Sequence, residues 1–119
     1  MDKITLKGMY FYGYHGTTKE ERKKGQKFYI DAEIFSDLKK AGKSDKLSDT
    51  IDYKKVYGLV RTIQAKKKYR LLEALSQDIA SGILKGFKGI KSATVSVRKP
   101  QVNVGGPLEY VEVKITRKK

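Results

Sequence analysis

The segment at residues 28–35 alternates at every position between two sets of side chains. A period of two residues predicts a β-strand with one buried face and one more polar face. Such a strand is typical of a sheet whose apolar face is covered by another layer. The set predicted to be buried is Phe28, Ile30, Ala32 and Ile34, and the opposite set is Tyr29, Asp31, Glu33 and Phe35.

Two segments in the middle of the chain have the spacing of amphipathic helices, which could cover such a sheet. The first begins after Asp52, whose side chain suits an N-cap. The second runs from Leu72 to about Leu84, and Gly86 and Gly89 end it. The apolar positions are Tyr53, Val56, Tyr57, Val60 and Ile63 in the first helix and Leu72, Leu75, Ile79 and Ile83 in the second.

Three further segments have the composition of strands. Residues 3–14 are rich in aromatic and β-branched side chains. Within them, Gly8 and Gly13 indicate a bulge or a close backbone approach. Residues 93–98 and 111–116 alternate again between apolar and polar side chains.

The predicted order is strand, strand, helix, helix, strand, strand, with polar connections at 17–24 and 39–49. This order predicts an α+β fold, a four-stranded antiparallel sheet with two helices on one face. The other face would be polar and charged. A chain of 119 residues is large enough for one core but not for two, so we expect a single domain over residues 1–119.

The residue inventory excludes several kinds of site. The chain has no cysteine and one histidine, His15. Thiolate chemistry is therefore excluded, and so is a metal site built from several Cys or His residues of one chain. No apolar stretch approaches the length of a membrane span, and the first residues lack the pattern of a signal peptide. We expect a cytoplasmic protein without a metal ion.

The chain is strongly basic, with 27 Lys and Arg against 13 Asp and Glu and a formal net charge of +14. Such a charge is compatible with nucleic acid, a membrane surface or an anionic substrate. The basic residues are spread along the whole chain, and the two clusters, 66–68 and 117–119, fall in a predicted loop and at the end. We therefore favour a solvated surface and expect neither a nucleic acid nor a membrane as partner.

One carboxylate stands beside the apolar stripe of the second helix. Glu73 falls in the first turn, where the helix dipole favours a negative charge. There it also offers a bidentate acceptor next to free backbone groups. This suits a planar ligand with two adjacent N–H donors, such as a 2-amino-4-oxo pyrimidine ring. The simpler alternative is a glutamate that only complements the dipole.

The chain contains four short motifs in a fixed order, Gly8–Gly16 (GMYFYGYHG) with Glu21, Asp49–Tyr53 (DTIDY), Leu71–Glu73 (LLE) and Val97–Pro100 (VRKP). Together they resemble the motifs of the dihydroneopterin aldolase family, and the match covers nearly the whole chain. The resemblance implies the tunnelling fold, with subunits assembled into a ring-shaped homo-oligomer, commonly an octamer of two stacked tetramers. A charged back face of the sheet would then line the tunnel.

The reaction implied by the resemblance is a retro-aldol cleavage of 7,8-dihydroneopterin in folate biosynthesis, with or without side-chain epimerisation. Aldolases need an electron sink for the broken C–C bond, commonly a lysine Schiff base or a metal ion. A dihydropterin offers its own sink, because its C=N bond beside the side chain can accept the electrons. The resemblance therefore implies an enzyme with no cofactor, independent of both metal and Schiff base.

The resemblance also implies the roles of the site residues. Glu73, with the backbone of Leu72, would anchor the pterin ring, and Lys99 would act as general acid and base. Glu21 would bind the side-chain hydroxyls. Tyr53 would reach in from the neighbouring subunit and take part in proton transfer. Two further residues would present their backbone to the ligand beside Tyr53, namely Ile51 and Asp52.

The loop Gln101–Gly106 departs from the family pattern, which often has a second proline there, so the resemblance does not extend to the shape of that wall. His15 either touches the substrate or closes the strand, and we favour the structural role. The alternatives in function are an epimerase of dihydroneopterin or its triphosphate, and a small basic RNA-binding module, whose order of elements differs.

Overall fold

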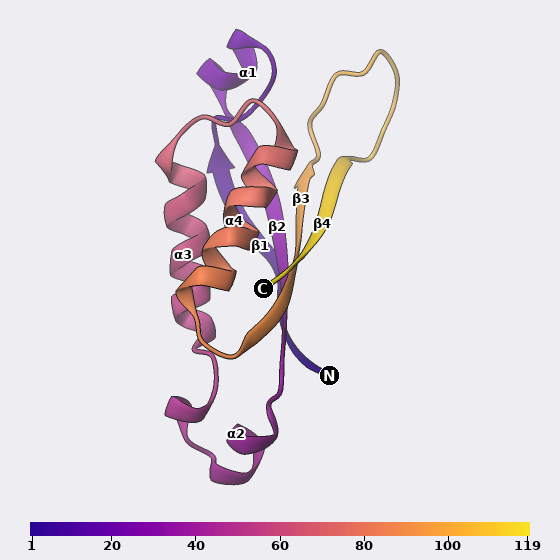
Figure 1. Ribbon diagram of the computed structural model, residues 1–119. Helices are drawn as coiled ribbons and strands as arrows, with labels where there is room; N and C mark the ends of the chain where they lie inside the picture. The colour runs from indigo at the N-terminus through magenta and orange to yellow at the C-terminus, as the bar shows by residue number, and fades with distance from the viewer.

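The computed structural model describes residues 1–119, whose four strands form one antiparallel sheet in the order β1-β2-β3-β4. Helices α3 and α4 lie side by side on one face of this sheet (Figure 1). The predicted order of two strands, two helices and two strands is confirmed. The elements are β1 (Asp2–Gly13), β2 (Gln26–Ser36), α3 (Tyr53–Lys66), α4 (Leu72–Gly86), β3 (Ile90–Lys99) and β4 (Val111–Lys118).

The core lies between the sheet and the two long helices. The side chains predicted to be buried on β2 are fully buried, and so are those at Leu75, Ile79 and Ile83 of α4. Both periodicities therefore identified the core faces correctly. The first helix agrees less well. Val56 and Val60 are fully buried, but Tyr53 in the first turn is 58% exposed and Tyr57 is 38% exposed, so both tyrosines lie outside the buried stripe.

Three short helical segments occupy the two stretches expected to be polar connections. They are α1 (Lys19–Lys24), α2 (Lys39–Ser44) and the 3-10 helix η1 (Leu47–Asp49). None of them has a buried residue, so no apolar period could indicate them. Helix α1 lies at the end of the molecule where α4 begins, and α2 lies at the opposite end (Figure 1).

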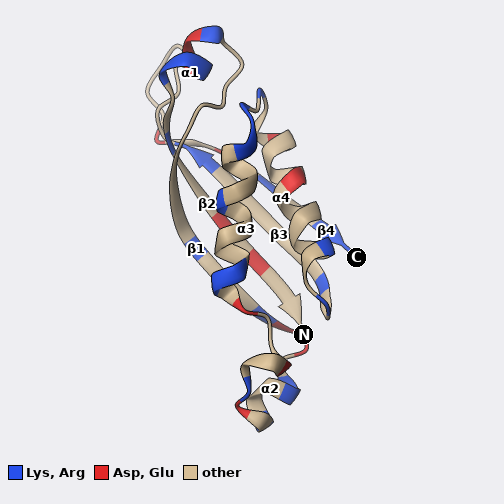
Figure 2. Cartoon of the chain, turned by 90° about the vertical axis from the view of Figure 1, so that its left-hand side faces the viewer, with Lys and Arg blue, Asp and Glu red and all other residues tan.

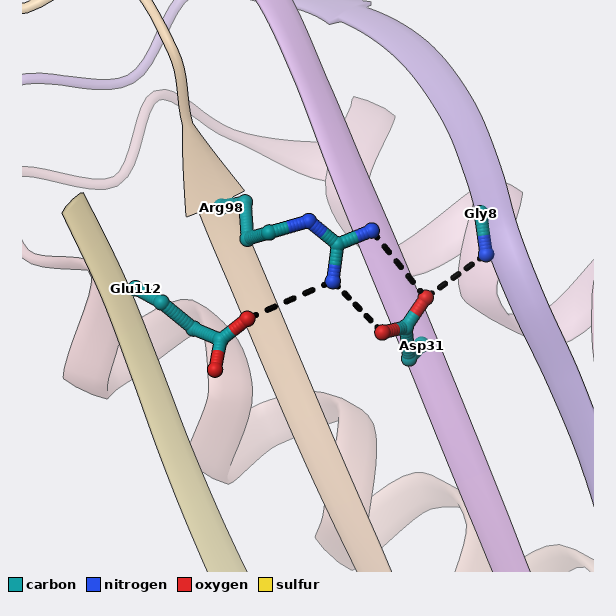
Figure 3. A network of polar contacts seen from close by, with 4 residues as sticks. All are labelled: Gly8, Asp31, Arg98 and Glu112. Atoms are coloured by element: carbon teal, nitrogen blue, oxygen red, sulfur yellow. Dashed lines mark hydrogen bonds and ion pairs between the residues drawn. The ribbon is translucent and has the colours of Figure 1, made fainter. Parts of the chain in front are cut away.

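A bulge interrupts β1 at Gly8, as its glycine predicted. The register against β2 shifts between Leu6 and Met9, and Gly8 has a φ of 70°, a conformation that glycine adopts without strain. The Gly8 N–H donates to Asp31 at 2.6 Å, and the Arg98 guanidinium binds both oxygens of the same carboxylate (Figure 3). Arg98 also donates to Glu112 at 3.3 Å. A row of polar contacts thus crosses all four strands on the face without helices.

Basic residues are distributed over the molecule. Figure 2 shows Lys and Arg on α1, α2, α3 and the strands rather than on a single element. None of the helices combines the length and the apolar character needed to cross a bilayer.

Candidate active site

A cavity of about 830 Å³ opens at the end of the molecule where β3 stops and α4 starts. Its walls come from α1, the first turn of α4, the end of β3 and the loop after it. Apolar and charged side chains both line it, as in sites that hold a small organic molecule. Four of the residues predicted for the site line this one cavity, namely Glu21, Leu72, Glu73 and Lys99.

Lys99 reaches the cavity because of the alternation of β3. The core-facing side chains of β3 are Ala93, Val95 and Val97. Lys99 follows Val97 by two residues and therefore lies on the same face of the strand. It is only 7% exposed. A buried ammonium needs a partner, and Lys99 forms an ion pair with the carboxylate of Glu21.

Glu21 is held by the start of α1. The Glu21 N–H donates to the Thr18 hydroxyl at 3.1 Å, while the Glu21 carboxylate accepts from the Thr18 N–H at 3.4 Å. This is a capping box, which orients the glutamate back toward the helix start. The hydrogen bond from Lys99 holds the pKa of the Glu21 carboxyl below its usual value, although burial opposes this. Glu21 is therefore a carboxylate at neutral pH.

Glu73 lies in the first turn of α4, as predicted. Its side chain is exposed at the cavity, and no ion pair of the chain involves it. The N-cap residue Leu71 makes no side-chain hydrogen bond, so the first amides of the helix have no capping partner. The Leu72 carbonyl accepts from the Ser76 hydroxyl at 2.7 Å. A free carboxylate and free N–H groups therefore face the cavity together.

The loop after β3 forms one wall of the cavity. Gln101, Val102, Asn103 and Val104 all line it. The Asn103 side chain accepts from the Gly105 N–H at 3.1 Å, which closes a local turn at a glycine with a φ of 89°. The departure from the family pattern therefore lies in the site itself.

The other three predicted residues lie elsewhere in the chain. Asp52 is the N-cap of α3, where its carboxylate accepts from the Lys54 N–H at 3.0 Å, as predicted. Ile51 is buried and borders a separate hollow of about 400 Å³. Helix α3 has 14 residues and is therefore about 20 Å long. It begins at the end of the molecule opposite to α1 and the cavity (Figure 1). One chain therefore does not bring Tyr53, Ile51 and Asp52 to Glu73 and Lys99.

Two residues beside the cavity were not predicted. Arg22 donates to the Gly16 carbonyl at 3.0 Å, and Tyr69 contacts His15 through both its backbone N–H and its ring. The sequence carried a signal for α1, because Thr18 and Glu21 have the spacing of a capping box. No local pattern indicated Tyr69. No three His, Asp or Glu side chains converge in a way that could hold a metal ion.

A family model and curated relatives indicate the same family. Residues 4–116 match the family model of FolB, dihydroneopterin aldolase. The chain is 41% identical over 119 residues to the dihydroneopterin aldolase of Bacillus subtilis (strain 168), with 100% of this chain and 99% of that protein covered.

Solved structures share the fold. The FolB protein of Vibrio cholerae superposes with a TM-score of 0.92 at 26% identity, covering 100% of this chain and 98% of that one. Escherichia coli dihydroneopterin aldolase, solved in complex with neopterin, gives a TM-score of 0.89 at 24% identity, covering 98% and 99%.

Proposed function

The chain belongs to the dihydroneopterin aldolase family, and we propose that it cleaves 7,8-dihydroneopterin into 6-hydroxymethyl-7,8-dihydropterin and glycolaldehyde, a lyase reaction of folate biosynthesis. The observation that carries this proposal is the meeting of the Lys99–Glu21 ion pair and the free Glu73 carboxylate at one cavity. A cavity of about 830 Å³ is large enough for a bicyclic ring with a short side chain.

Glu73 and the start of α4 would hold the ring. The ring presents two adjacent N–H donors, which match the two oxygens of one carboxylate. The uncapped first turn of the helix offers N–H donors to the ring oxygen beside them. These contacts involve a part of the substrate that does not change in the reaction, so they would bind substrate and product alike.

The proposed cleavage breaks the bond between the first and second carbons of the side chain. The hydroxyl on the second carbon loses its proton, and this carbon becomes the aldehyde of glycolaldehyde. The bonding electrons pass into the neighbouring C=N bond of the ring, whose nitrogen takes up a proton. The first carbon is then protonated as the nitrogen loses its proton and the C=N bond re-forms. No external oxidant or reductant is needed.

The residues at the reacting end of the cavity have the chemistry for these proton transfers. In the proposal, Lys99 delivers and removes protons, either directly or through a water molecule. The Glu21 carboxylate keeps the ammonium in place and accepts hydrogen bonds from the side-chain hydroxyls. The ion pair thus orients both the acid–base group and the bond that breaks.

The active site would be completed by a neighbouring subunit. The start of α3, with Ile51, Asp52 and Tyr53, lies at the far end of a helix about 20 Å long from the cavity. These residues could therefore reach a ligand in the cavity only in another copy of the chain. Strands β1 and β4 each have one unpaired edge, which supports ring formation through strand pairing between subunits. We propose a ring-shaped homo-oligomer, an octamer of two stacked tetramers, in the cytoplasm.

The test is incubation of the purified protein with 7,8-dihydroneopterin and detection of glycolaldehyde and the hydroxymethyl product. We expect equimolar amounts of both. Formation of a diastereomer of the substrate without glycolaldehyde would instead identify an epimerase, an alternative that the names of the relatives do not favour. Absence of both reactions would refute the proposal.

A further inference from the structure

His15 is a buried titratable side chain near the cavity that the proposed reaction does not use. Its imidazole is 2% exposed and packs edge-on against the rings of Phe28 and Tyr69, at 5.1 and 5.4 Å between centroids. Its Nδ1 accepts a hydrogen bond from the Tyr69 N–H at 3.0 Å. An accepting Nδ1 places the ring proton on Nε2, which faces the Gln64 side-chain oxygen at 3.5 Å.

A second hydrogen bond runs beside the first between the same two segments. The Gly16 N–H donates to the Tyr69 carbonyl at 2.9 Å. These two bonds, here called the loop bridge, join the segment after β1 to the segment before α4. The first bond joins residues 54 positions apart along the chain, and the second joins residues 53 positions apart. No strand or helix holds these segments together, so they are connected by one backbone bond and one bond to the His15 side chain.

On one side, the loop bridge packs against Glu21. A methyl group at Gly16 would come within 2.5 Å of the Glu21 Cβ and 2.8 Å of its carboxyl carbon, so these residues are in close contact. Arg22 adds a hydrogen bond to the Gly16 carbonyl at 3.0 Å. A shift of Gly16 would therefore move the carboxylate that pairs with Lys99.

On the other side, the loop bridge determines where α4 starts. Tyr69 lies three residues before Leu72, and its side chain is 3% exposed. Its hydroxyl donates to Asp78 of α4 at 2.7 Å. Tyr69 is thus attached both to the helix that carries Glu73 and to the loop that leads to Glu21.

We propose that His15 is a positioning residue that holds Glu21 and Lys99 at the correct distance from Glu73 by means of the loop bridge. The role is one of geometry, since the imidazole is buried and its Nδ1 is occupied by the Tyr69 N–H. Gly13 makes room for the ring, because a methyl group there would come within 2.7 Å of it. The inference rests on the proposed function, because the groups that it positions, Glu21 and Lys99, are those to which the proposed function gives the proton transfers and the substrate hydroxyls.

Two substitutions at His15 separate the hydrogen bond from the packing. His15→Phe keeps a ring between Phe28 and Tyr69 but has no acceptor for the Tyr69 N–H. His15→Asn provides a side-chain oxygen close to the place of Nδ1 and so keeps the acceptor. Because small displacements of reacting groups reduce rates steeply, we expect kcat to fall roughly tenfold to a hundredfold in His15→Phe and less than about threefold in His15→Asn.

A matched control excludes a general loss of stability. Ile34 is fully buried at the far end of β2 and lines neither cavity. Ile34→Val or Ile34→Ala, whichever matches the melting temperature of His15→Phe, should keep the kcat of the unmodified protein. Amide exchange of Gly16 should become at least about tenfold faster in His15→Phe but not in the control, since local opening sets the exchange rate.

The proposal is overturned if folded His15→Phe has the kcat of the Ile34 control, or if the Gly16 amide keeps its protection. If His15→Phe does not fold, Gly13→Ala is used instead, because its methyl group displaces the imidazole without removing it. An unchanged kcat in Gly13→Ala would then refute the role. If the unmodified protein does not cleave dihydroneopterin, the proposed function fails, while amide exchange still decides whether His15 holds the two segments together.

Discussion

Replacement of Glu73 by alanine should weaken binding of the product 6-hydroxymethyl-7,8-dihydropterin. In the proposed complex the carboxylate accepts two charge-assisted hydrogen bonds from the ring, each with a net contribution of about 1.5–3 kcal/mol. Glu73 is exposed at the cavity, so solvent access favours the lower part of that range. We therefore expect a loss of about 2–4 kcal/mol, which corresponds to a Kd raised roughly 30- to 700-fold.

The same substitution should have little effect on folding. Glu73 has no ion-pair partner in the chain, and its contribution to stability is its interaction with the dipole of α4. This interaction is worth about 0.3–1 kcal/mol at an exposed site. The effect on binding should thus be several times larger than the effect on the free energy of unfolding. Thermal melting of the free variant measures the second quantity, and isothermal titration with product measures the first.

Glu20 provides the matched control. It lines the same cavity from α1, is exposed, and carries the same charge. Glu20→Ala should change the Kd of the product by less than about twofold, since without a paired hydrogen bond only a screened charge is lost. The role of Glu73 as ring anchor would be refuted if Glu73→Ala bound product as tightly as the unmodified protein, or if Glu20→Ala lost as much affinity.

Three further predictions follow from the site. Lys99→Ala should lower kcat by roughly a hundredfold or more, the scale of a positioned acid–base group, and should leave the affinity for product nearly unchanged. Mixing Lys99→Ala chains with inactive Tyr53→Ala chains should restore activity. No recovery in mixed oligomers would argue that each chain holds a complete site. Activity should survive EDTA and borohydride, and a loss reversed by zinc would contradict the metal-free mechanism. Burial lowers the pKa of His15, while hydrogen bonds to Gln64 oppose this shift and the charge of Lys99 adds to it. The free energy of unfolding should therefore fall as the pH drops below about 6.5, by up to about 1.4 kcal/mol per pH unit. This slope should be absent in His15→Asn.

The sheet and the long helices could be predicted because their periods extend over many residues. The alternation at 28–35 has one arrangement that buries Phe28, Ile30, Ala32 and Ile34 together, and the helical spacing has one that buries Leu75, Ile79 and Ile83 together. Helix α1 has six residues and no buried side chain, so it carries no such period. Its sole signal was the capping box of Thr18 and Glu21, which depends on two residues.

The candidate site could be predicted only in part. The alternation of β3 is sufficient to put Lys99 on the core face, and the start of α4 is sufficient to put Glu73 in a first turn. The contact of Lys99 with Glu21 joins residues 78 positions apart, and that of His15 with Tyr69 joins residues 54 positions apart. Both contacts depend on how loops meet at one end of the sheet, and the local sequence pattern does not specify this.

The row of polar contacts through Gly8, Asp31, Arg98 and Glu112 has a consequence for how the sheet comes apart. The row runs perpendicular to the strands and includes one residue from each (Figure 3). Sheets usually fray from their outer strands. Here, detachment of β1 would remove the Gly8 N–H from the Asp31 carboxylate. Detachment of β4 would separate Glu112 from Arg98. Slippage by one position would carry Asp31 into the apolar layer. Both outer strands are therefore held in one register against the strands beside them, so each presents a fixed outer edge with which a neighbouring strand could pair, although the edge of β1 is bent at the Gly8 bulge.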